Sequence, residues 1–352
     1  MLVTIKVGTK IVLNEEVLSR VVSEISELVL SGEKVVIVSS GAIGLGRKKL
    51  NFFGHASLSE KQALSSIGQP ELMKLYQKLF SAFDIKIAQI LLTYNDINSK
   101  RGFLHLKNTI NELFKIGAVP IVNENDAVAV EEIKFGNNDI LSALVSTTIV
   151  SDKLIILTDV DGIYRNYGTT RQELVRVVND VREVSKFMKG RGSEFSTGGM
   201  KTKIQAGFIC MKAGIECIIA NGFKENIIAS VLKGMEGTRF VPDTEKKSLK
   251  DRLLIMFRKK GYIVVDEGAV KAIKSKKSLL PVGIKDVKGR FSVGDAVFIS
   301  DDSGNNIAIG ITNYSHSEIE KIKGKKSSEI GKILGISEFD EEVVHIDNMV
   351  LL

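Results

Sequence analysis

Short apolar runs alternate with helix-like segments along the first two-thirds of this chain, and this alternation limits the fold more than any other feature. Leu2–Val7 and Val35–Val38 have the length and apolar character of buried strands, and Glu15–Leu30 between them carries apolar residues at helical spacing. Apolar strands separated by helices are typical of a mostly parallel sheet that helices cover on both faces. Further strands are expected at Ile85–Leu92, Ala118–Val122, Leu154–Leu157 and Ile215–Ile219, and helices through Phe83 and at Asn98–Ile116, Ile140–Val150 and Met200–Met211.

The pattern changes after Gly237. Pro242–Lys250 is polar and charged, as expected of a linker, and short turn-rich runs follow Gly261. Such runs predict a small β-barrel or sandwich, with strands at Tyr262–Val265, Leu279–Ile284, Val287–Phe291, Ala296–Ile299 and Ile307–Ile311. Because 352 residues exceed one ordinary core, we expect two domains. The predicted boundaries are 1–242 for the α/β domain, 243–260 for the linker, 261–340 for the barrel and 341–352 for the tail.

Composition excludes several kinds of site and points to one compartment. The two cysteines, Cys210 and Cys217, fit neither a disulfide framework nor a zinc site, and four scattered histidines indicate neither a histidine–metal centre nor a Ser-His-Asp triad. No apolar run approaches the length that spans a bilayer, and the N-terminus enters a strand without a basic leader. We therefore expect a cytoplasmic protein that is not attached to a membrane.

The positive charge is unevenly distributed. The net charge is +7, and Lys246–Arg290 holds fourteen Lys or Arg residues against four Asp or Glu residues. This excess suits an anionic ligand and is compatible with binding of RNA or DNA. It is equally compatible with a solvated surface and a linker, and charge alone does not decide between them.

Polar residues follow four of the predicted strands at the point where each strand ends. In open α/β sheets, ligands bind beyond the carboxyl ends of the strands. The segments concerned are Lys6–Thr9, Ser39–Gly41, Asn123–Asp126 and Thr158–Asp159. Their common position predicts one site at this edge of the sheet.

Two dense polar clusters, NEND at Asn123–Asp126 and NND at Asn137–Asp139, lie close together in the sequence. Carboxylates and amides of this kind can bind an ammonium group, fix a metal-bound phosphate or hold lysines in place. The alternative is that they form turns and a helix N-cap, a role that suits Asp139 ahead of the expected Ile140 helix. Their density at strand ends favours a binding site.

Two segments have the features of anion sites. Ser39–Gly46 offers three glycines after a strand, although it matches neither G-x-G-x-x-G nor a Walker P-loop, and a tight turn without ligand explains it equally well. Ser196–Lys203 opens a helix, and helix N-termini attract phosphate, although a flexible loop with a glycine cap is the alternative.

Lysines from two distant segments complete the predicted chemistry. Lys6 stands near the end of an apolar strand, where a solvated surface charge is poorly placed. Phosphoryl transfer needs positioning and neutralisation of oxygens that gain charge. Lys6 and Lys203, held by Asp139, would meet that need, and Mg²⁺ would be carried mainly by the nucleotide phosphates, with no metal site on the protein.

Five motifs together resemble those of the glutamate 5-kinases of the amino-acid kinase superfamily. They are IKVGT (Ile5–Thr9), SSGAIGLG (Ser39–Gly46), NENDAVAVEEIKFGNND (Asn123–Asp139), LTDVDGIY (Leu157–Tyr164) and TGGMKTK (Thr197–Lys203). Past Gly261 the sequence resembles the PUA domain of many bacterial members. The resemblance implies a carbamate-kinase-like three-layer αβα sandwich with a mostly parallel sheet and a small β-barrel-like PUA domain.

The resemblance also implies an activity, ATP-dependent phosphorylation of the γ-carboxylate of L-glutamate, the first step towards proline. It implies catalytic roles for Lys6, Lys203 and Asp139. Glutamate would be bound by Ser40, Asp126 and Asn138, with Gly41 and Asn123 nearby. ATP would be bound by Lys6, Thr158, Asp159, Thr197, Gly198, Gly199, Met200, Lys201, Thr202 and Lys203.

Two positions depart from the family pattern, Asn137 for a frequent aspartate and Ser196 for a frequent glycine. Feedback inhibition by proline and a homo-oligomeric state, dimer or tetramer, are expected from the resemblance. One alternative is a related kinase that acts on aspartate, acetylglutamate, carbamate or uridylate. Another is an RNA-binding accessory protein, which the PUA-like segment motivates; RNA binding is retained as a secondary property.

Overall fold

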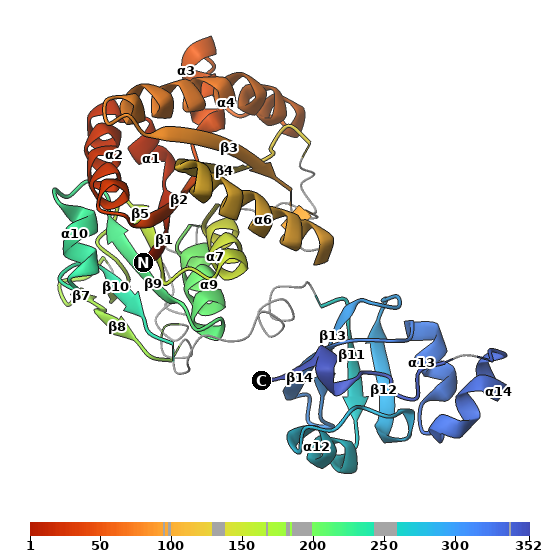
Figure 1. Cartoon of the computed structure of the whole chain (residues 1–352). Coiled ribbons are helices and arrows are strands. Elements are labelled where there is room, and N and C mark those ends of the chain that lie inside the picture. Colours follow the sequence, from red (N-terminus) through yellow and green to blue (C-terminus); the bar gives the residue numbers. More distant parts are fainter. Residues whose placement is uncertain are drawn as a thin grey trace. The chain divides into compact units, whose positions relative to one another are not determined.

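The computed structural model describes residues 1–93, 96–97, 100–128, 138–166, 168–180, 184, 199–242, 259–337 and 339–352. The chain divides into two compact units, Met1–Lys246 and Lys247–Leu352, called the first and second units below (Figure 1). None of the helices within the described ranges has the length and apolar character needed to cross a bilayer.

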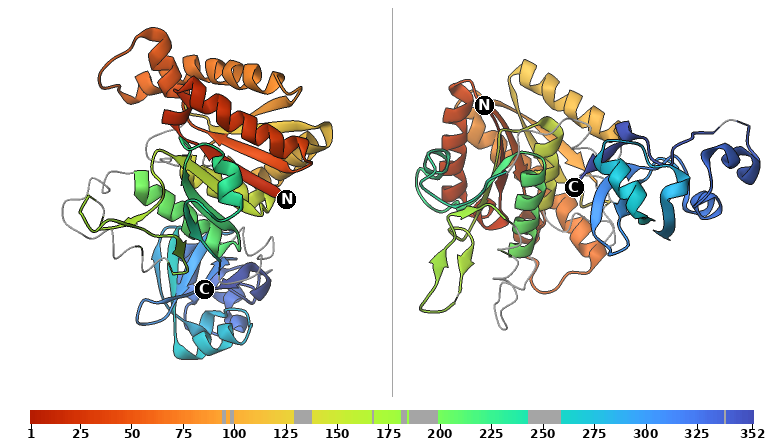
Figure 2. Two further views of the ribbon diagram at one scale, coloured as in Figure 1. Left: turned by 90° about the vertical axis from the view of Figure 1, so that its left-hand side faces the viewer. Right: turned by 90° about the horizontal axis from the view of Figure 1, so that it is seen from below.

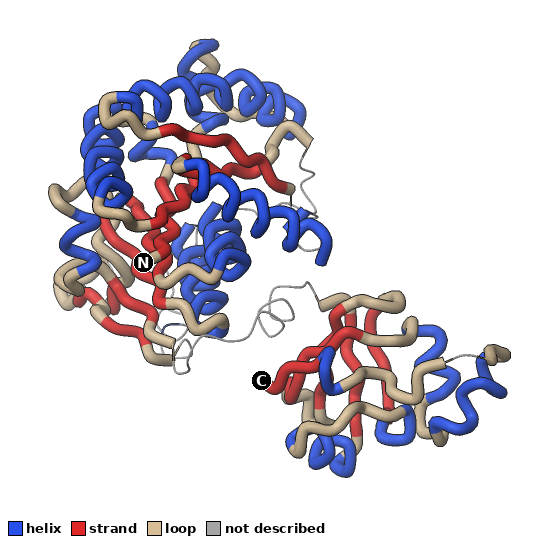
Figure 3. Tube along the Cα trace, in the orientation of Figure 1, coloured by secondary structure: helices blue, strands red, loops and turns tan. Residues whose placement is uncertain are grey.

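Eight strands form the central sheet of the first unit, in the order β3-β4-β2-β1-β5-β9-β10-β8 (Figure 3). Neighbouring strands from β3 to β9 run parallel, whereas β10 runs antiparallel to β9 and parallel to β8. The carboxyl ends of β1, β2, β4 and β5 therefore share one edge. The strands are β1 (Leu2–Val7), β2 (Lys34–Ser39), β3 (Lys86–Leu92), β4 (Ala118–Glu124), β5 (Lys153–Thr158), β8 (Val177–Val178), β9 (Glu216–Asn221) and β10 (Thr238–Phe240).

Helices cover both faces of this sheet, as Figures 1 and 2 show. On one face lie α2 (Glu15–Leu30), α4 (Leu58–Ser81) and α10 (Ile227–Leu232), and on the other α6 (Lys100–Ile116), α7 (Asn138–Ile149) and α9 (Gly199–Lys212). The short α1 (Thr9–Val12) precedes α2, and α3 (Ala42–Leu50) packs against α4. A hairpin of β6 (Tyr164–Arg165) and β7 (Glu173–Leu174) stands apart from the sheet. The predicted α/β sandwich is confirmed.

The second helix shows how local sequence produces this layer. Asn14 caps α2, its side chain accepting a hydrogen bond from the Val17 N–H at 3.1 Å. Leu18 and Ile25 are among the residues of α2 that are fully buried against the sheet. Burying a side chain of this size stabilises the fold by about 1.5–3 kcal/mol. The spacing of these residues is what predicted the helix.

Glycines let α3 and α4 approach closely. A Cβ atom on Gly68 would lie 1.7 Å from the Ala42 carbonyl oxygen, and one on Gly46 would lie 2.0 Å from the Leu64 carbonyl oxygen. Gly41 before α3 has φ 112°, a conformation that favours glycine. Only Ser40 and Gly41 of the predicted glycine loop are therefore loop, since β2 ends at Ser39 and the helix already begins at Ala42.

The second unit has its own five-stranded sheet, ordered β12-β11-β13-β14-β15, and a separate apolar core. Its strands are β11 (Gly261–Val265), β12 (Ile284–Gly289), β13 (Ala296–Ser300), β14 (Asn306–Ile311) and β15 (Met349–Leu351). Its helices are α12 (Glu267–Lys274), α13 (His316–Ile322) and α14 (Ile330–Leu334), with 3₁₀ turns at Pro281–Gly283, Ser327–Glu329 and Ile346–Asn348.

One of the predicted strands is wrong in this unit, and another has different bounds. Leu279–Ile284 holds one isolated bridge at Leu279 and then a 3₁₀ turn that Pro281 opens, because proline has no N–H to donate to a sheet. The strand predicted at Val287–Phe291 begins earlier, at Ile284, and ends at Gly289. Apart from Val128, the segment Val128–Phe135, whose sequence predicts a short hairpin, lies outside the described residues, and so does most of the expected linker.

Candidate active site

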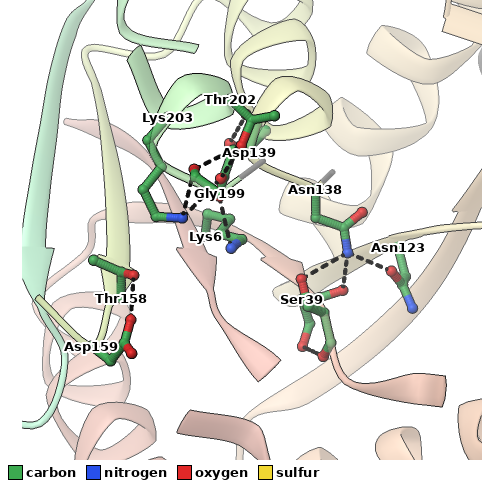
Figure 4. A network of polar contacts seen from close by, with 12 residues as sticks. Lys6, Ser39, Asn123, Asn138, Asp139, Thr158, Asp159, Gly199, Thr202 and Lys203 are labelled. Carbon is green, nitrogen blue, oxygen red and sulfur yellow. Dashed lines mark hydrogen bonds and ion pairs between the residues drawn. The ribbon is translucent and has the colours of Figure 1, made fainter. Parts of the chain in front are cut away.

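Three charged side chains from three elements meet at the carboxyl edge of the first unit's sheet. Lys6 lies near the end of β1, Asp139 in the first turn of α7, and Lys203 near the start of α9. Lys6 Nζ lies 2.7 Å from Asp139 Oδ1, and Lys203 Nζ lies 3.0 Å from Asp139 Oδ2 (Figure 4). Two ammonium groups that are 197 positions apart in the sequence therefore share one carboxylate.

Burial makes this charge cluster unusual. Asp139 is 0% exposed, Lys6 is 4% exposed and Lys203 is 8% exposed. Burial alone would raise the pKa of Asp139, but the two ammonium groups outweigh it and hold that pKa below its usual value. Burial, together with the nearby positive charge of Lys203, lowers the pKa of Lys6, although Asp139 opposes the shift. The cluster carries one positive charge more than it carries negative charge, and so suits a buried anion.

The first turn of α9 adds polar groups to the cluster. The Thr202 hydroxyl lies 3.0 Å from Asp139 Oδ2 and 2.9 Å from the Gly199 carbonyl oxygen, which also lies 3.3 Å from Lys203 Nζ. Met200 is buried, and Lys201 is exposed. Other members of the predicted ATP loop, Thr197 and Gly198, lie outside the described residues, as do Asn137 and Ser196.

A cavity of about 580 Å³ lies beside these groups. Asn138, which directly precedes Asp139, is one of the residues that line it. Of the residues predicted to bind glutamate, the cavity brings together Ser40, Gly41, Asn123, Asp126 and Asn138. The remaining lining residues are Thr9, Leu13, Ala42, Ile43, Gly44, Arg47 and Glu124. Two carboxylates and one guanidinium suit a small zwitterionic ligand.

Asn138 joins three parts of the cavity wall. Its Nδ2 lies 2.9 Å from the Ser39 carbonyl oxygen, 3.1 Å from Ser40 Oγ and 2.8 Å from Asn123 Oδ1 (Figure 4). The loop after β2, the end of β4 and the start of α7 are therefore tied together. This position also corrects the prediction that Asp139 caps α7, because the helix already begins at Asn138 and Asp139 lies inside its first turn.

The end of β5 forms a second polar group on the same edge. Thr158 Oγ1 donates a hydrogen bond of 3.2 Å to Asp159 Oδ1, and Lys10 Nζ lies 2.5 Å from Asp159 Oδ2. The hydrogen bond from Lys10 lowers the pKa of Asp159. Asp161, two residues further along the chain, accepts a 3.0 Å hydrogen bond from the Asn221 amide. Thr158 is as buried as Lys203, whereas Lys10 and Asp159 face solvent.

Sequence reasoning missed two polar residues of the site, Lys10 and Arg47. Thr9 and Glu124 lie in segments that were predicted to form the site, but neither was given a role of its own. Glu124 stands inside the polar cluster that was recognised, so its place in the sequence was a usable signal. Arg47 and Lys10 lie on helices whose orientation toward the site depends on packing. Their position at the site could not be predicted from sequence spacing alone.

No group of three His, Cys, Asp or Glu side chains within the described ranges is placed to hold a metal ion. Asp139, the most buried carboxylate of the site, is engaged by two lysines. The cationic cluster fits the phosphate groups of a nucleotide better than a bare metal ion.

Among solved structures, the first unit resembles carbamate kinase from Giardia lamblia bound to AMP-PNP. The match has a TM-score of 0.51 and 18% identity, and covers 69% of this chain and 98% of that chain. A second structure of Giardia carbamate kinase matches with a TM-score of 0.50. At this identity the likeness concerns the fold alone.

Similarity in sequence identifies the family as well as the fold. Residues 1–221 match the amino acid kinase family, and residues 261–334 match the PUA domain. Glutamate 5-kinase from Caldanaerobacter subterraneus is 42% identical over 367 aligned positions, covering 100% of this chain and 98% of the relative. Glutamate 5-kinase from Dictyoglomus thermophilum is 42% identical and covers 99% of this chain and 97% of the relative. The chain therefore belongs to the amino acid kinase family and, within it, to the glutamate 5-kinases that carry a PUA domain.

Proposed function

We propose that this protein transfers the γ-phosphoryl group of ATP to the γ-carboxylate of L-glutamate and so forms L-glutamyl 5-phosphate for proline biosynthesis. A carboxylate oxygen forms a bond to the γ-phosphorus, the bond from that phosphorus to the bridging oxygen breaks, and ADP leaves. The observation that carries the proposal is the buried pair Lys6 and Lys203 on Asp139, beside a cavity with amide and carboxylate walls.

The two lysines would act on the phosphates. Negative charge shifts among the phosphate oxygens during transfer, and preorganised cations stabilise it most effectively where water is excluded. Lys6 and Lys203 approach Asp139 through different oxygens, so the carboxylate would hold both ammonium groups in position. Asp139 is therefore assigned a positioning role.

The cavity would hold glutamate. Asp126 would pair with the ammonium group, because an unpaired charge in a closed site is costly. Ser40 and Asn138 would bind the substrate, with Gly41 and Asn123 supporting the wall. These roles rest on the position of the residues in the cavity and on the resemblance of their motifs.

ATP would extend from the lysines towards the end of β5. Thr158 and Asp159 would contact the nucleotide there, and Gly199–Lys203 would contact the phosphates together with Thr197 and Gly198, which lie outside the described residues. Mg²⁺ would be carried mainly by the phosphates and would neutralise charge on them. The excess positive charge of the buried cluster suits this polyanion.

Several properties complete the proposal. We expect inhibition by proline at the glutamate cavity, a homo-oligomer (dimer or tetramer) and a cytoplasmic location. We also propose RNA binding by the PUA domain as a secondary property, on the basis of its basic residues. The domain boundaries at 242/243 and 260/261 are retained as proposals. The boundary at 340/341 is not, because Met349–Leu351, which was predicted as tail, forms β15 of the second unit's sheet.

The activity is tested by trapping the acyl phosphate. The protein is incubated with ATP, Mg²⁺, hydroxylamine and one acceptor at a time: glutamate, aspartate, acetylglutamate, carbamate or UMP. Glutamate should yield ADP and γ-glutamyl hydroxamate in equal amounts, at a rate well above that of any other acceptor. A strong preference for another acceptor would assign the chain to a different reaction of the same fold.

A further inference from the structure

A chain of four side-chain amides runs from the glutamate cavity into the interior of the first unit. Asn138 Nδ2 lies 2.8 Å from Asn123 Oδ1, and Asn123 Nδ2 lies 2.9 Å from Gln69 Oε1. Gln69 Nε2 in turn lies 3.1 Å from Gln89 Oε1 on β3. Asn123 and Gln69 are 2% and 8% exposed, so these hydrogen bonds are shielded from water.

Two backbone groups determine which atom donates and which accepts along this row of amide side chains. The oxygen and nitrogen of an amide side chain are normally hard to distinguish. The Glu124 N–H, which can only donate, lies 2.8 Å from Asn123, so the atom facing it is the oxygen. The Ser39 carbonyl, which can only accept, lies 2.9 Å from Asn138, so the atom facing it is the nitrogen. Asn123 must then donate to Gln69.

One acceptor is left over at the cavity end. Asn138 Oδ1 is buried and accepts a hydrogen bond from no group of the described residues. In Figure 4 it points away from Ser39 and Asn123. A buried acceptor without a donor is costly, and such groups mark sites where a ligand completes the hydrogen bonding. Asn138 lines the cavity together with Asp126, whose carboxylate is negatively charged.

We propose that the amide chain holds the carbonyl oxygen of Asn138 toward the ammonium group of the substrate, and that Gln69 and Gln89 are positioning residues for amino-acid recognition. The inference rests on the proposed function. An ammonium group has three hydrogens, of which Asp126 and Asn138 Oδ1 take two. Gln69 contributes an acceptor that holds the Asn123 amide in the orientation Asn138 needs.

The test separates this positioning role from general support of the fold. Gln69→Met keeps the length of the side chain but removes the acceptor, whereas Gln69→Glu keeps an oxygen opposite Asn123. Gln77→Met, on the exposed side of the same helix, is the matched control. Steady-state kinetics for glutamate and for ATP are measured on all three variants and on the unaltered protein.

Gln69→Met should raise the KM for glutamate about tenfold, as expected when a hydrogen bond to a charged group is loosened, and leave kcat and the KM for ATP within about twofold. Gln69→Glu should stay within about threefold of the unaltered protein, and Gln77→Met should be unchanged. Glutarate, which lacks the ammonium group, should be phosphorylated equally by the unaltered protein and Gln69→Met.

Three results would overturn the inference: a normal KM for glutamate in Gln69→Met, equal losses in Gln69→Met and Gln69→Glu, or a parallel loss with glutarate. Each of these can occur while the unaltered protein phosphorylates glutamate, so the positioning role can fail while the proposed function stands. If the unaltered protein forms no glutamyl hydroxamate, the proposed function itself fails.

Discussion

Replacing Asp139 with asparagine tests the buried charge cluster most severely. Asp139→Asn keeps the shape of the side chain but removes the negative charge between two ammonium groups that lie 2.7 and 3.0 Å from its oxygens. Lys6 and Lys203 are 4% and 8% exposed, so water cannot replace the lost charge well. Two buried cations without a counter-ion should destabilise the nucleotide-free protein.

The expected loss can be estimated from burial. Removing one partner of a buried ion pair destabilises a protein by about 3–5 kcal/mol. Deprotonation of a lysine limits the cost, since the pKa of Lys6 is already lowered. Phosphate oxygens can replace the missing carboxylate as counter-ions. A nonhydrolysable ATP analogue with Mg²⁺ should therefore stabilise Asp139→Asn more than it stabilises the unaltered protein.

Urea unfolding followed by circular dichroism measures this, since the chain contains no tryptophan for fluorescence. Asp139→Asn should lower the free energy of unfolding of the first unit by about 3–5 kcal/mol without nucleotide. Asp84→Asn, at an exposed site, is the control and should change it by less than about 0.5 kcal/mol. If Asp139→Asn unfolds at the same urea concentration as the unaltered protein, the buried-charge reasoning is refuted.

Four further outcomes are expected. Asp126→Ala should raise the KM for glutamate at least about tenfold and leave the KM for ATP unchanged, because it removes a charged partner of the ammonium group. As pH rises, kcat/KM for ATP should begin to fall below the usual lysine pKa of 10.5, because the pKa of Lys6 is lowered and its ammonium group loses its charge there. Lys6→Arg should abolish this decline, since an arginine keeps its charge. Because the unfolded state binds more protons in that range, the nucleotide-free protein should gain stability over the same rise in pH. Gly68→Ala should destabilise the first unit by about 1–3 kcal/mol in thermal unfolding, since its Cβ would lie 1.7 Å from the Ala42 carbonyl oxygen; an unchanged melting temperature would contradict the close crossing of α3 and α4.

Much of the first unit follows from sequence periodicity. The expected strand Leu2–Val7 and the expected helix Glu15–Leu30 have the predicted ends, because burial on one or both faces imposes a clear apolar pattern. The same reasoning predicts the site, since the carboxyl ends of parallel strands share one edge. The sequence therefore predicts that Lys6 and Asp139 lie close together.

The second unit was harder to predict because its elements are short. The helix Glu267–Lys274 and the helix His316–Ile322 were not anticipated, and Pro281 turned an apolar run into a 3₁₀ turn instead of a strand. Short amphipathic segments carry too few residues to show a period. Tertiary packing therefore decides their conformation.

Contacts between side chains far apart in the sequence could not be predicted from it. Lys10 reaches Asp159 across 149 positions, and Gln69 reaches Asn123 across 54. Neither pair shares a local motif, and both depend on how helices pack on the sheet. The amide chain behind Asn138 becomes visible only when α4, β3, β4 and α7 are placed together.

The proposed mechanism requires two lysines to act together on one phosphoryl group. Rapid-quench measurement of single-turnover phosphoryl transfer from ATP to glutamate, on Lys6→Met, Lys203→Met and the double variant, tests this most directly. Each single change should slow transfer by about 10³-fold or more, and the double change should cost much less than the product of the two, because groups that act as a unit are not additive. A correctly folded single variant that transfers within tenfold of the unaltered rate would contradict the account.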